Sequence, residues 1–346
     1  MTDWPRLGTT HLGSVPYTDL HSVSERLAVT LDIPAWAQFS RRSFRENMYV
    51  QFSAALPRVV IDPTRERIWV NTVGDLTPDL EAFYALYLED YVDAFALTPD
   101  YAAGFFAMLD VLTVMPGTWA KGQVTGPVSL GLSVTDQDRY AILYHDLLSD
   151  VVVKTLAMNA RWQVRQLRAL RPRVLIFVDE PYLASFGSAY VSLERDAVIA
   201  MLNEVFAAIH SEGGLAGVHC CGNTDWSLLL DTSVDVLNLD AFGYLDALAL
   251  YPEELRAFLD RGGVVAWGIV PNNETISEVS AAELAERLWA GLQQLSERAA
   301  GRGLHIAPEE LLGRGLLTPS CGLGTATPEI ADQVYATLIA LKETLL

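Results

Sequence analysis

The 346-residue sequence contains only three cysteines and has no apolar stretch long enough to span a membrane. So small and odd a number of cysteines, two of them adjacent, argues against a disulfide framework, and we expect reduced thiols. A transmembrane helix needs about 18 consecutive apolar residues, and polar residues interrupt every candidate run. The N-terminal stretch also lacks the basic region and apolar segment of a secretory signal, which predicts a cytoplasmic protein.

Basic residues are also scarce. The chain has 24 Lys and Arg against 43 Asp and Glu, giving a net charge of -19. Because proteins bind nucleic acids mainly by neutralising phosphates, this balance opposes a nucleic-acid partner. With 51% hydrophobic residues and no low-complexity linker, the chain is long enough and apolar enough to bury a large core. We therefore expect a single domain over residues 1–346.

The sequence contains a series of short β-rich or apolar segments. Each ends in small or reactive residues and is followed by a helix-like stretch. Eight such segments occur, at residues 9–16, 35–40, 120–127, 174–181, 215–222, 234–242, 264–271 and 316–323. The clearest amphipathic stretches between them are residues 80–96, 138–170, 195–213 and 281–303. Eight strands that alternate with helices predict an α/β fold, the (β/α)₈ TIM barrel, whose active site lies at the carboxyl ends of the strands.

An open, doubly wound sheet is the alternative fold. It is disfavoured because the sequence has neither a G-x-G-x-x-G motif nor a Walker motif after an early strand. The segment near residues 59–72 has strand-like runs on either side of Pro63 to Glu66. This pattern predicts a β-hairpin inserted between the second and third barrel strands.

The sequence HCC at residues 219–221 contains two of the three cysteines. Residues two apart in a strand share a face, so His219 and Cys221 are expected on one side and Cys220 on the other, in packing. Cys321 ends the last predicted strand, and Asp240 closes the segment at 234–242. A lone cysteine or histidine is usually a packing residue, but together these side chains match the thiolate, imidazole and carboxylate ligands of Zn²⁺.

A second candidate is the acidic pair Asp179 and Glu180, which ends the apolar run at 174–181. Buried carboxylates are costly unless they meet cations, hydrogen-bond donors or solvent in a cleft, so the pair indicates either a site or a cap on the following helix. Gly13 and Ser14, and the segment 125–129, are weaker signals because such residues often form turns.

With these motifs in view, residues from about 9 to 342 resemble the C-terminal catalytic barrel of the cobalamin-independent methionine synthase family. The wider superfamily includes uroporphyrinogen decarboxylase and zinc-dependent corrinoid methyltransferases. Three segments are similar to the family's zinc-binding strands: HCC at 219–221, PSCGL at 319–323 and DVLNLD at 235–240. The third segment ends in Asp240 where the family has glutamate. The resemblance implies His219, Cys221, Cys321 and Asp240 as zinc ligands.

The resemblance also implies substrate contacts. The family's homocysteine-binding segments look like Gly13 and Ser14 and the DEP sequence that begins at Asp179. Glu46, within the segment 41–48, is similar to a further glutamate of the family. The first two segments would bind the carboxylate and ammonium groups of an amino-acid substrate, and Glu46 is expected as a further substrate contact.

Two departures from the family bear on the methyl donor. Folate-dependent members carry an additional N-terminal barrel, and they place a tryptophan at the position that counts to Ser133 here. This sequence has neither feature and resembles the short, core forms of the family. The resemblance therefore implies methylcobalamin or a corrinoid protein as donor and disfavours folate.

These observations together predict a zinc-dependent methyltransferase that converts homocysteine to methionine. Three alternatives stay open. The acceptor is another thiol such as coenzyme M, or the chain is a metal-free lyase resembling uroporphyrinogen decarboxylase, to which the segment 33–42 is similar. The third alternative is a non-catalytic barrel that binds a corrinoid or its carrier protein, with zinc structural or absent.

Overall fold

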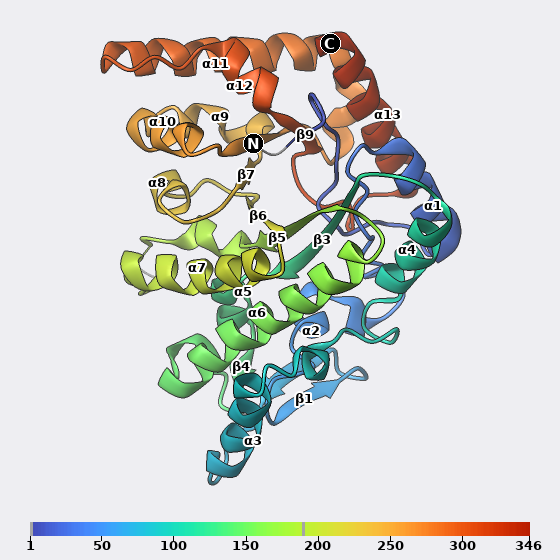
Figure 1. The fold of residues 1–346 in the computed structure, drawn as a ribbon, viewed down its shortest axis with the longest axis vertical. Coiled ribbons are helices and arrows are strands. Elements are labelled where there is room, and N and C mark those ends of the chain that lie inside the picture. The colour runs from blue at the N-terminus through green and yellow to red at the C-terminus, as the bar shows by residue number, and fades with distance from the viewer. Residues whose placement is uncertain (1–2, 189–190) are drawn as a thin grey trace.

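The computed structural model describes residues 3–188 and 191–346, which form an α/β barrel (Figure 1). Its main sheet has six parallel strands in the order β3-β5-β6-β7-β8-β9. They are β3 (Trp119–Thr125), β5 (Arg173–Asp179), β6 (Leu215–Cys220), β7 (Val236–Leu239), β8 (Val264–Val270) and β9 (Leu316–Pro319). These strands coincide with six of the predicted segments.

The two remaining predicted segments, 9–16 and 35–40, form isolated β-bridges rather than strands, and these bridges close the ring. Thr9 pairs in parallel with Leu317 of β9, Ser14 pairs with Gln38, and Ala35 pairs with Lys121 of β3. Backbone hydrogen bonds run the same way, from Thr10 N to the Leu317 carbonyl at 3.1 Å and from Lys121 N to the carbonyl of residue 34 at 2.7 Å. The predicted barrel fold is therefore confirmed.

Most of the helices cover the outside of the barrel (Figure 1). The helices of the described residues are α1 (Leu20–Thr30), α2 (Met48–Gln51), α3 (Thr77–Leu88), α4 (Ala103–Val114), α5 (Pro127–Ser133), α6 (Asp146–Arg168), α7 (Arg195–Ser211), α8 (Trp226–Leu230), α9 (Ala241–Leu248), α10 (Pro252–Asp260), α11 (Ala281–Gly301), α12 (Pro308–Arg314) and α13 (Pro328–Leu345). Two predicted helices agree closely with α7 and α11. The stretch predicted at 80–96 is divided, because Asp90 has a left-handed φ of 54° between α3 and a 3-10 helix at Val92–Phe95.

The inside of the barrel changes in character along the strands. A small apolar cluster fills its lower part, including Leu175, Phe177, Val236 and Val264. The next interior layer toward the carboxyl ends is polar and buried, and contains Gln123, Asp179, His219, Asn238 and Thr318. The apolar cluster fills the barrel below this polar layer, so among the described residues the interior favours a site at the mouth above it.

The predicted hairpin is present as β1 (Val59–Asp62) and β2 (Arg67–Val70), which pair antiparallel. Its turn is held by Asp62 Oδ1, which accepts hydrogen bonds from Thr64 N at 3.0 Å and Arg65 N at 3.1 Å. β2 also pairs in parallel with the short strand β4 (Thr135–Asp136), so the insertion forms a small separate sheet. Among the described residues, no helix is both long and apolar enough to cross a membrane.

Candidate metal and substrate site

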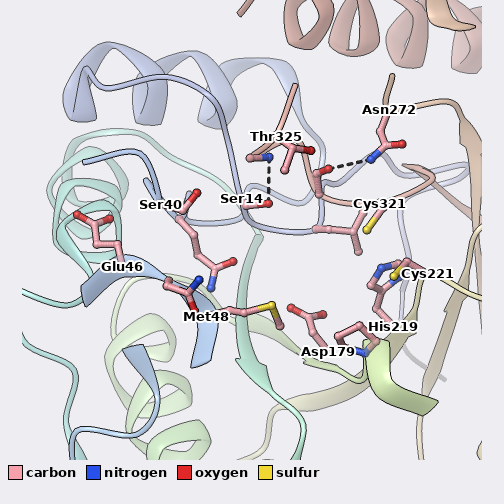
Figure 2. A pocket seen from close by; sticks show the side chains of 16 residues that line it. Ser14, Ser40, Glu46, Met48, Asp179, His219, Cys221, Asn272, Cys321 and Thr325 are labelled. Atoms are coloured by element: carbon pink, nitrogen blue, oxygen red, sulfur yellow. Dashed lines mark hydrogen bonds between the residues drawn. The ribbon is translucent and has the colours of Figure 1, made fainter. Parts of the chain in front are cut away.

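Three of the four predicted metal ligands meet at the barrel mouth (Figure 2). The ligand atoms of His219, Cys221 and Cys321 all lie within 4.8 Å of one another. His219 belongs to β6, Cys221 follows the end of that strand, and Cys321 follows β9. The alternation of strand side chains thus points His219 and Cys221 the same way, and the closure of the barrel brings Cys321 toward them.

The His219 ring has a hydrogen-bond partner at one nitrogen and none at the other among the described residues. Its Nδ1 lies 2.5 Å from Asn238 Oδ1. Its Nε2 is buried and has no hydrogen-bond partner among the described residues. Burial acts to lower the pKa of His219, but Cys221 and Asp179 outweigh it and raise that pKa above its ordinary value. A buried nitrogen without a partner, close to two sulfur atoms, fits a metal ligand.

The two thiols differ in their affinity for a proton. A hydrogen bond from Cys321, and then the His219 ring, hold the pKa of Cys221 well below its usual range. The pKa of Cys321 is raised, first by Cys221 and then by burial. Cys221 is therefore the more acidic thiol of the pair. A thiolate, a second thiol and an imidazole nitrogen are ligands that Zn²⁺ prefers, so the residues present fit this ion.

Cys220 lies apart from this cluster. It is fully buried within the main hydrophobic core, and its Sγ is 3.5 Å from the Gly222 carbonyl oxygen. Burial raises the pKa of its thiol to about 12. The prediction that Cys220 packs, although its neighbour Cys221 faces the site, is confirmed.

Asp240 is not brought into the cluster. It is the N-cap of α9, and its Oδ1 accepts a hydrogen bond from Gly243 N at 2.8 Å. Among the described residues, the group of metal-ligating atoms is limited to His219, Cys221 and Cys321. The carboxylate is held as a helix cap because α9 begins directly after Asp240. A zinc ion held by these three residues alone would keep a fourth position open, as in catalytic rather than structural zinc sites.

The cluster opens into a cavity of about 340 Å³ at the mouth of the barrel. Its lining includes the three predicted ligands and also Ser14, Glu46 and Asp179, which the sequence had suggested as substrate contacts. Gly13 lies beside it with φ at 146°, and a Cβ there would come within 2.8 Å of Gln38 Oε1. The backbone at this position therefore requires glycine, which leaves the hydroxyl of Ser14 at the cavity wall.

Asp179 is the acidic residue best placed for a ligand. Figure 2 shows its carboxylate directed into the cavity below Cys321. Its Oδ1 is buried and has no hydrogen-bond partner within the described residues. Burial raises the pKa of Asp179 to about 6, although His219 and the buried Lys121 act to lower it. A buried carboxylate oxygen without a donor is a natural partner for a cationic group of a substrate.

Glu180, the second residue of the acidic pair, has a structural role at the start of a helix. It is fully buried, and its oxygens accept hydrogen bonds from Val128 N at 2.9 Å and Ser129 N at 2.8 Å. The hydroxyl of Ser129 donates a third at 2.6 Å. Burial raises the pKa of Glu180 to about 7, and these donors act in the opposite direction. Glu180 thus anchors the start of α5, and Asp179 alone faces the cavity.

Glu46 lines the cavity at the end opposite the sulfur atoms (Figure 2). One of its oxygens accepts from Phe39 N at 3.1 Å, and the other lies 3.1 Å from Arg42 Nη1. Both oxygens of Glu46 therefore already have partners, in contrast to Asp179.

Two asparagines were missed by the sequence reasoning. Asn272 donates from Nδ2 to the Gly322 carbonyl at 2.9 Å and accepts from Ser320 Oγ at 3.1 Å, so it holds both residues that flank Cys321. Asn238 binds His219 from the neighbouring strand. Their positions in the sequence were the available signal, because Asn238 interrupts an apolar strand and Asn272 follows another after Pro271.

Comparison with known proteins defines the fold class. A B12-independent methionine synthase from a Shewanella species, solved in complex with selenomethionine, matches with a TM-score of 0.59 and 15% identity over 98% of each chain. A putative vitamin-B12 independent methionine synthase from Listeria monocytogenes matches with a TM-score of 0.47 and 14% identity, covering 80% of this chain and 89% of its own. No family model and no curated protein matches the sequence. The resemblance expected from the sequence is thus confirmed for the fold.

The expected corrinoid donor, methylcobalamin or a corrinoid protein, is wrong. The Shewanella protein that shares this fold over the whole chain is described as B12-independent, whereas methylcobalamin is a form of B12. The expectation depended on the absence of a tryptophan at Ser133 and of a second barrel. The lack of one aromatic side chain does not specify which other donor binds, so the inference had no positive support. The corrinoid-binding alternative is withdrawn with it.

Proposed function

We propose that this protein is a zinc-dependent methyltransferase that methylates a thiol, with homocysteine as acceptor and methionine as product. The observation that carries the proposal is the cluster of His219, Cys221 and Cys321, which opens onto the same cavity as the unpaired carboxylate of Asp179. A thiol-activating centre and an ammonium-binding group within one cavity match the two ends of an amino-acid thiol. The Shewanella protein of this fold binds selenomethionine, a selenium analogue of that product.

Each residue has a distinct task in this mechanism. His219, Cys221 and Cys321 would hold Zn²⁺ and leave one position for the substrate sulfur. When bound, the ion lowers the pKa of a coordinated thiol, which is otherwise about 8.5, and so supplies a thiolate at neutral pH. Asp179 binds the substrate ammonium group, and Ser14 hydrogen-bonds to its carboxylate. With its amino-acid end and its sulfur both held, the substrate presents the sulfur to the incoming methyl group. Orientation of this kind supplies a large part of enzymatic rate enhancement.

The neighbouring cysteines provide a matched test of the metal site. We expect purified protein to contain about one zinc per chain and Cys220→Ala to retain it, because the Cys220 thiol is packed in the core. Cys221→Ala should lose most of the zinc, since its thiolate belongs to the ligand cluster. Metal content is measured by inductively coupled plasma mass spectrometry. Zinc-free wild-type protein, or equal zinc in the two variants, contradicts the proposal.

The reaction can be tested without knowledge of the natural donor. Methyl iodide transfers its methyl group to a thiolate and releases iodide, so zinc-loaded protein should accelerate formation of methionine from homocysteine at pH 7. Asp179→Asn should weaken this acceleration, and Cys221→Ala should abolish it. Mercaptoethanesulfonate (coenzyme M) is the comparison thiol because it has no ammonium group. If it is methylated as fast as homocysteine, the assignment of an amino-acid acceptor is wrong.

A further inference from the structure

Asn238 connects three strands inside the barrel. It lies in β7, is fully buried, and stands in register with His219 of β6 on one side and Ala266 of β8 on the other. Its Oδ1 lies 2.5 Å from His219 Nδ1, and its Nδ2 donates to the Ala266 carbonyl at 2.8 Å. The same Nδ2 donates to Thr318 Oγ1 of β9 at 2.9 Å. Asn238 therefore has a hydrogen-bond partner for both ends of its amide.

These contacts determine which way the amide faces. A backbone carbonyl only accepts hydrogen bonds, so the amide nitrogen of Asn238 has to face Ala266. Its oxygen then faces His219, and an amide oxygen also only accepts. The hydrogen in the contact with His219 must come from Nδ1 of the ring. In a neutral imidazole with hydrogen on Nδ1, Nε2 carries the free lone pair.

The other ring nitrogen is where that lone pair is needed. Nε2 of His219 is buried without a hydrogen-bond partner in the described part of the chain. His219 belongs to the cluster in which it, Cys221 and Cys321 each offer a ligand atom within 4.8 Å of the others. Metal-binding histidines generally donate their second ring N–H to an oxygen acceptor, which fixes both the tautomer and the ring orientation.

We infer that Asn238 is a positioning residue for the metal site: anchored on the Ala266 carbonyl, it holds His219 in the Nδ1–H tautomer, so that Nε2 faces the two cysteines as a ligand before any metal binds. The inference rests on the proposed function because the zinc site is part of that proposal. Its first consequence, however, concerns the metal-free protein and is measurable by itself.

The tautomer is read by nitrogen-15 NMR of the wild-type protein without metal. Long-range correlations from the ring protons distinguish Nδ1–H from Nε2–H, and the signals of His219 are assigned by their loss in His219→Gln. We expect His219 to be the Nδ1–H tautomer at pH 8. An Nε2–H tautomer in this sample overturns the inference.

A pair of variants then separates positioning from general stability. Asn159 is a second buried asparagine whose Nδ2 donates to the Phe95 carbonyl at 2.8 Å and whose Oδ1 accepts from Gln163 at 2.9 Å, within α6. Both Asn238→Leu and Asn159→Leu remove a buried amide and leave its partners unsatisfied. Only Asn238→Leu should weaken zinc binding, by about 10- to 100-fold in competition with a chromophoric chelator. Asn159→Leu should stay within about 2-fold of wild type.

Asn238→Asp serves as the conservative variant. If Asn238→Leu does not fold, the tautomer and the zinc affinity of Asn238→Asp test the inference in its place. It keeps an oxygen acceptor for His219 Nδ1, so we expect the Nδ1–H tautomer and most of the zinc affinity to be retained. Unchanged zinc affinity in Asn238→Leu, or the same loss in Asn159→Leu, overturns the inference. If the wild type binds no zinc, the proposed function is refuted. If that protein nevertheless shows the Nδ1–H tautomer of His219 and Asn238→Leu loses it, control of the tautomer by Asn238 is supported.

Discussion

Asp179 and Glu180 are adjacent in sequence and occupy opposite environments. Glu180 accepts three hydrogen bonds at the start of α5, whereas Asp179 keeps one buried oxygen without a donor among the described residues. The protein thus uses one carboxylate for its own structure and leaves the other available. At the scale of single residues, this difference in partners distinguishes a binding group from a structural one.

The environment of Asp179 predicts a specific pH dependence. Burial raises its pKa to about 6, so the carboxylate becomes protonated as the pH falls through that value and loses its attraction for an ammonium group. For the wild type, kcat/KM for homocysteine should fall below about pH 6, since this parameter follows ionisations of the free enzyme. Asp179→Asn should be about 10- to 100-fold lower above pH 6, because a hydrogen bond to a charged group contributes about 1.5–3 kcal/mol.

Comparison of the two profiles isolates Asp179 from the metal ligands, which also take up protons at low pH. When wild-type rates are divided by those of Asp179→Asn, the pH dependence of the metal ligands cancels. The step near pH 6 that depends on Asp179 should remain in the ratio. A ratio that is constant from pH 5 to pH 8 would therefore refute the assignment. A thiol without an ammonium group, such as 3-mercaptopropionate, should show a ratio close to one throughout.

At the scale of elements, Glu180 of the loop after β5 fixes the first turn of α5. The helix begins at Pro127, and its first free N–H groups, on Val128 and Ser129, both donate to Glu180. Glu180→Ala leaves these two N–H groups and the O–H of Ser129 buried without an acceptor. Each unsatisfied buried group costs about 1–3 kcal/mol, so we expect a loss of at least about 3 kcal/mol of unfolding free energy.

The measurement is chemical denaturation followed by circular dichroism. Glu194→Ala is a matched control, because Glu194 is the exposed N-cap residue of α7 and its side chain makes no capping hydrogen bond. It should change the unfolding free energy by less than about 0.5 kcal/mol. If Glu180→Ala is as stable as this control, Glu180 does not anchor α5.

Elements also show which features could be predicted from sequence. The shared face of His219 and Cys221 was predictable because it depends only on the two-residue period of a strand. Asp240 was expected as a ligand because it closes the predicted segment at 234–242, but the strand ends at Leu239 and Asp240 caps the next helix. Local sequence does not specify where a strand gives way to a helix to within one residue. That single residue decided whether the carboxylate became a ligand or a cap.

Asn238 was not predictable for a different reason. Its partners Ala266 and Thr318 lie 28 and 80 residues further along the chain, and only closure of the barrel brings them to its amide. A lone asparagine in an apolar segment indicates that something must satisfy it, but not what. The contact that holds His219 therefore depends on long-range geometry rather than on a local sequence pattern.

At the scale of the whole molecule, the ligands lie on strands from different parts of the ring. His219 lies in β6 and Cys221 follows it, Cys321 follows β9, and the two strands are separated in the sheet by β7 and β8. A metal bound by all three would connect the two sides of the barrel mouth. The hydrophobic core surrounds the strands and does not include these ligands, so the fold should not depend on the metal for its existence.

Metal removal is accordingly expected to lower stability without unfolding the chain. A ligand at 100 times its dissociation constant stabilises the folded state by about 2.7 kcal/mol. In domains of about 150–250 residues, 1 kcal/mol shifts Tm by about 2–4 °C, so zinc should raise Tm by about 5 °C in this longer chain. Differential scanning calorimetry with and without a chelator measures the shift. Cys321→Ala should stay folded and lose it, whereas Cys220→Ala should keep it, and unfolding of the wild type on chelation would instead identify a structural zinc site.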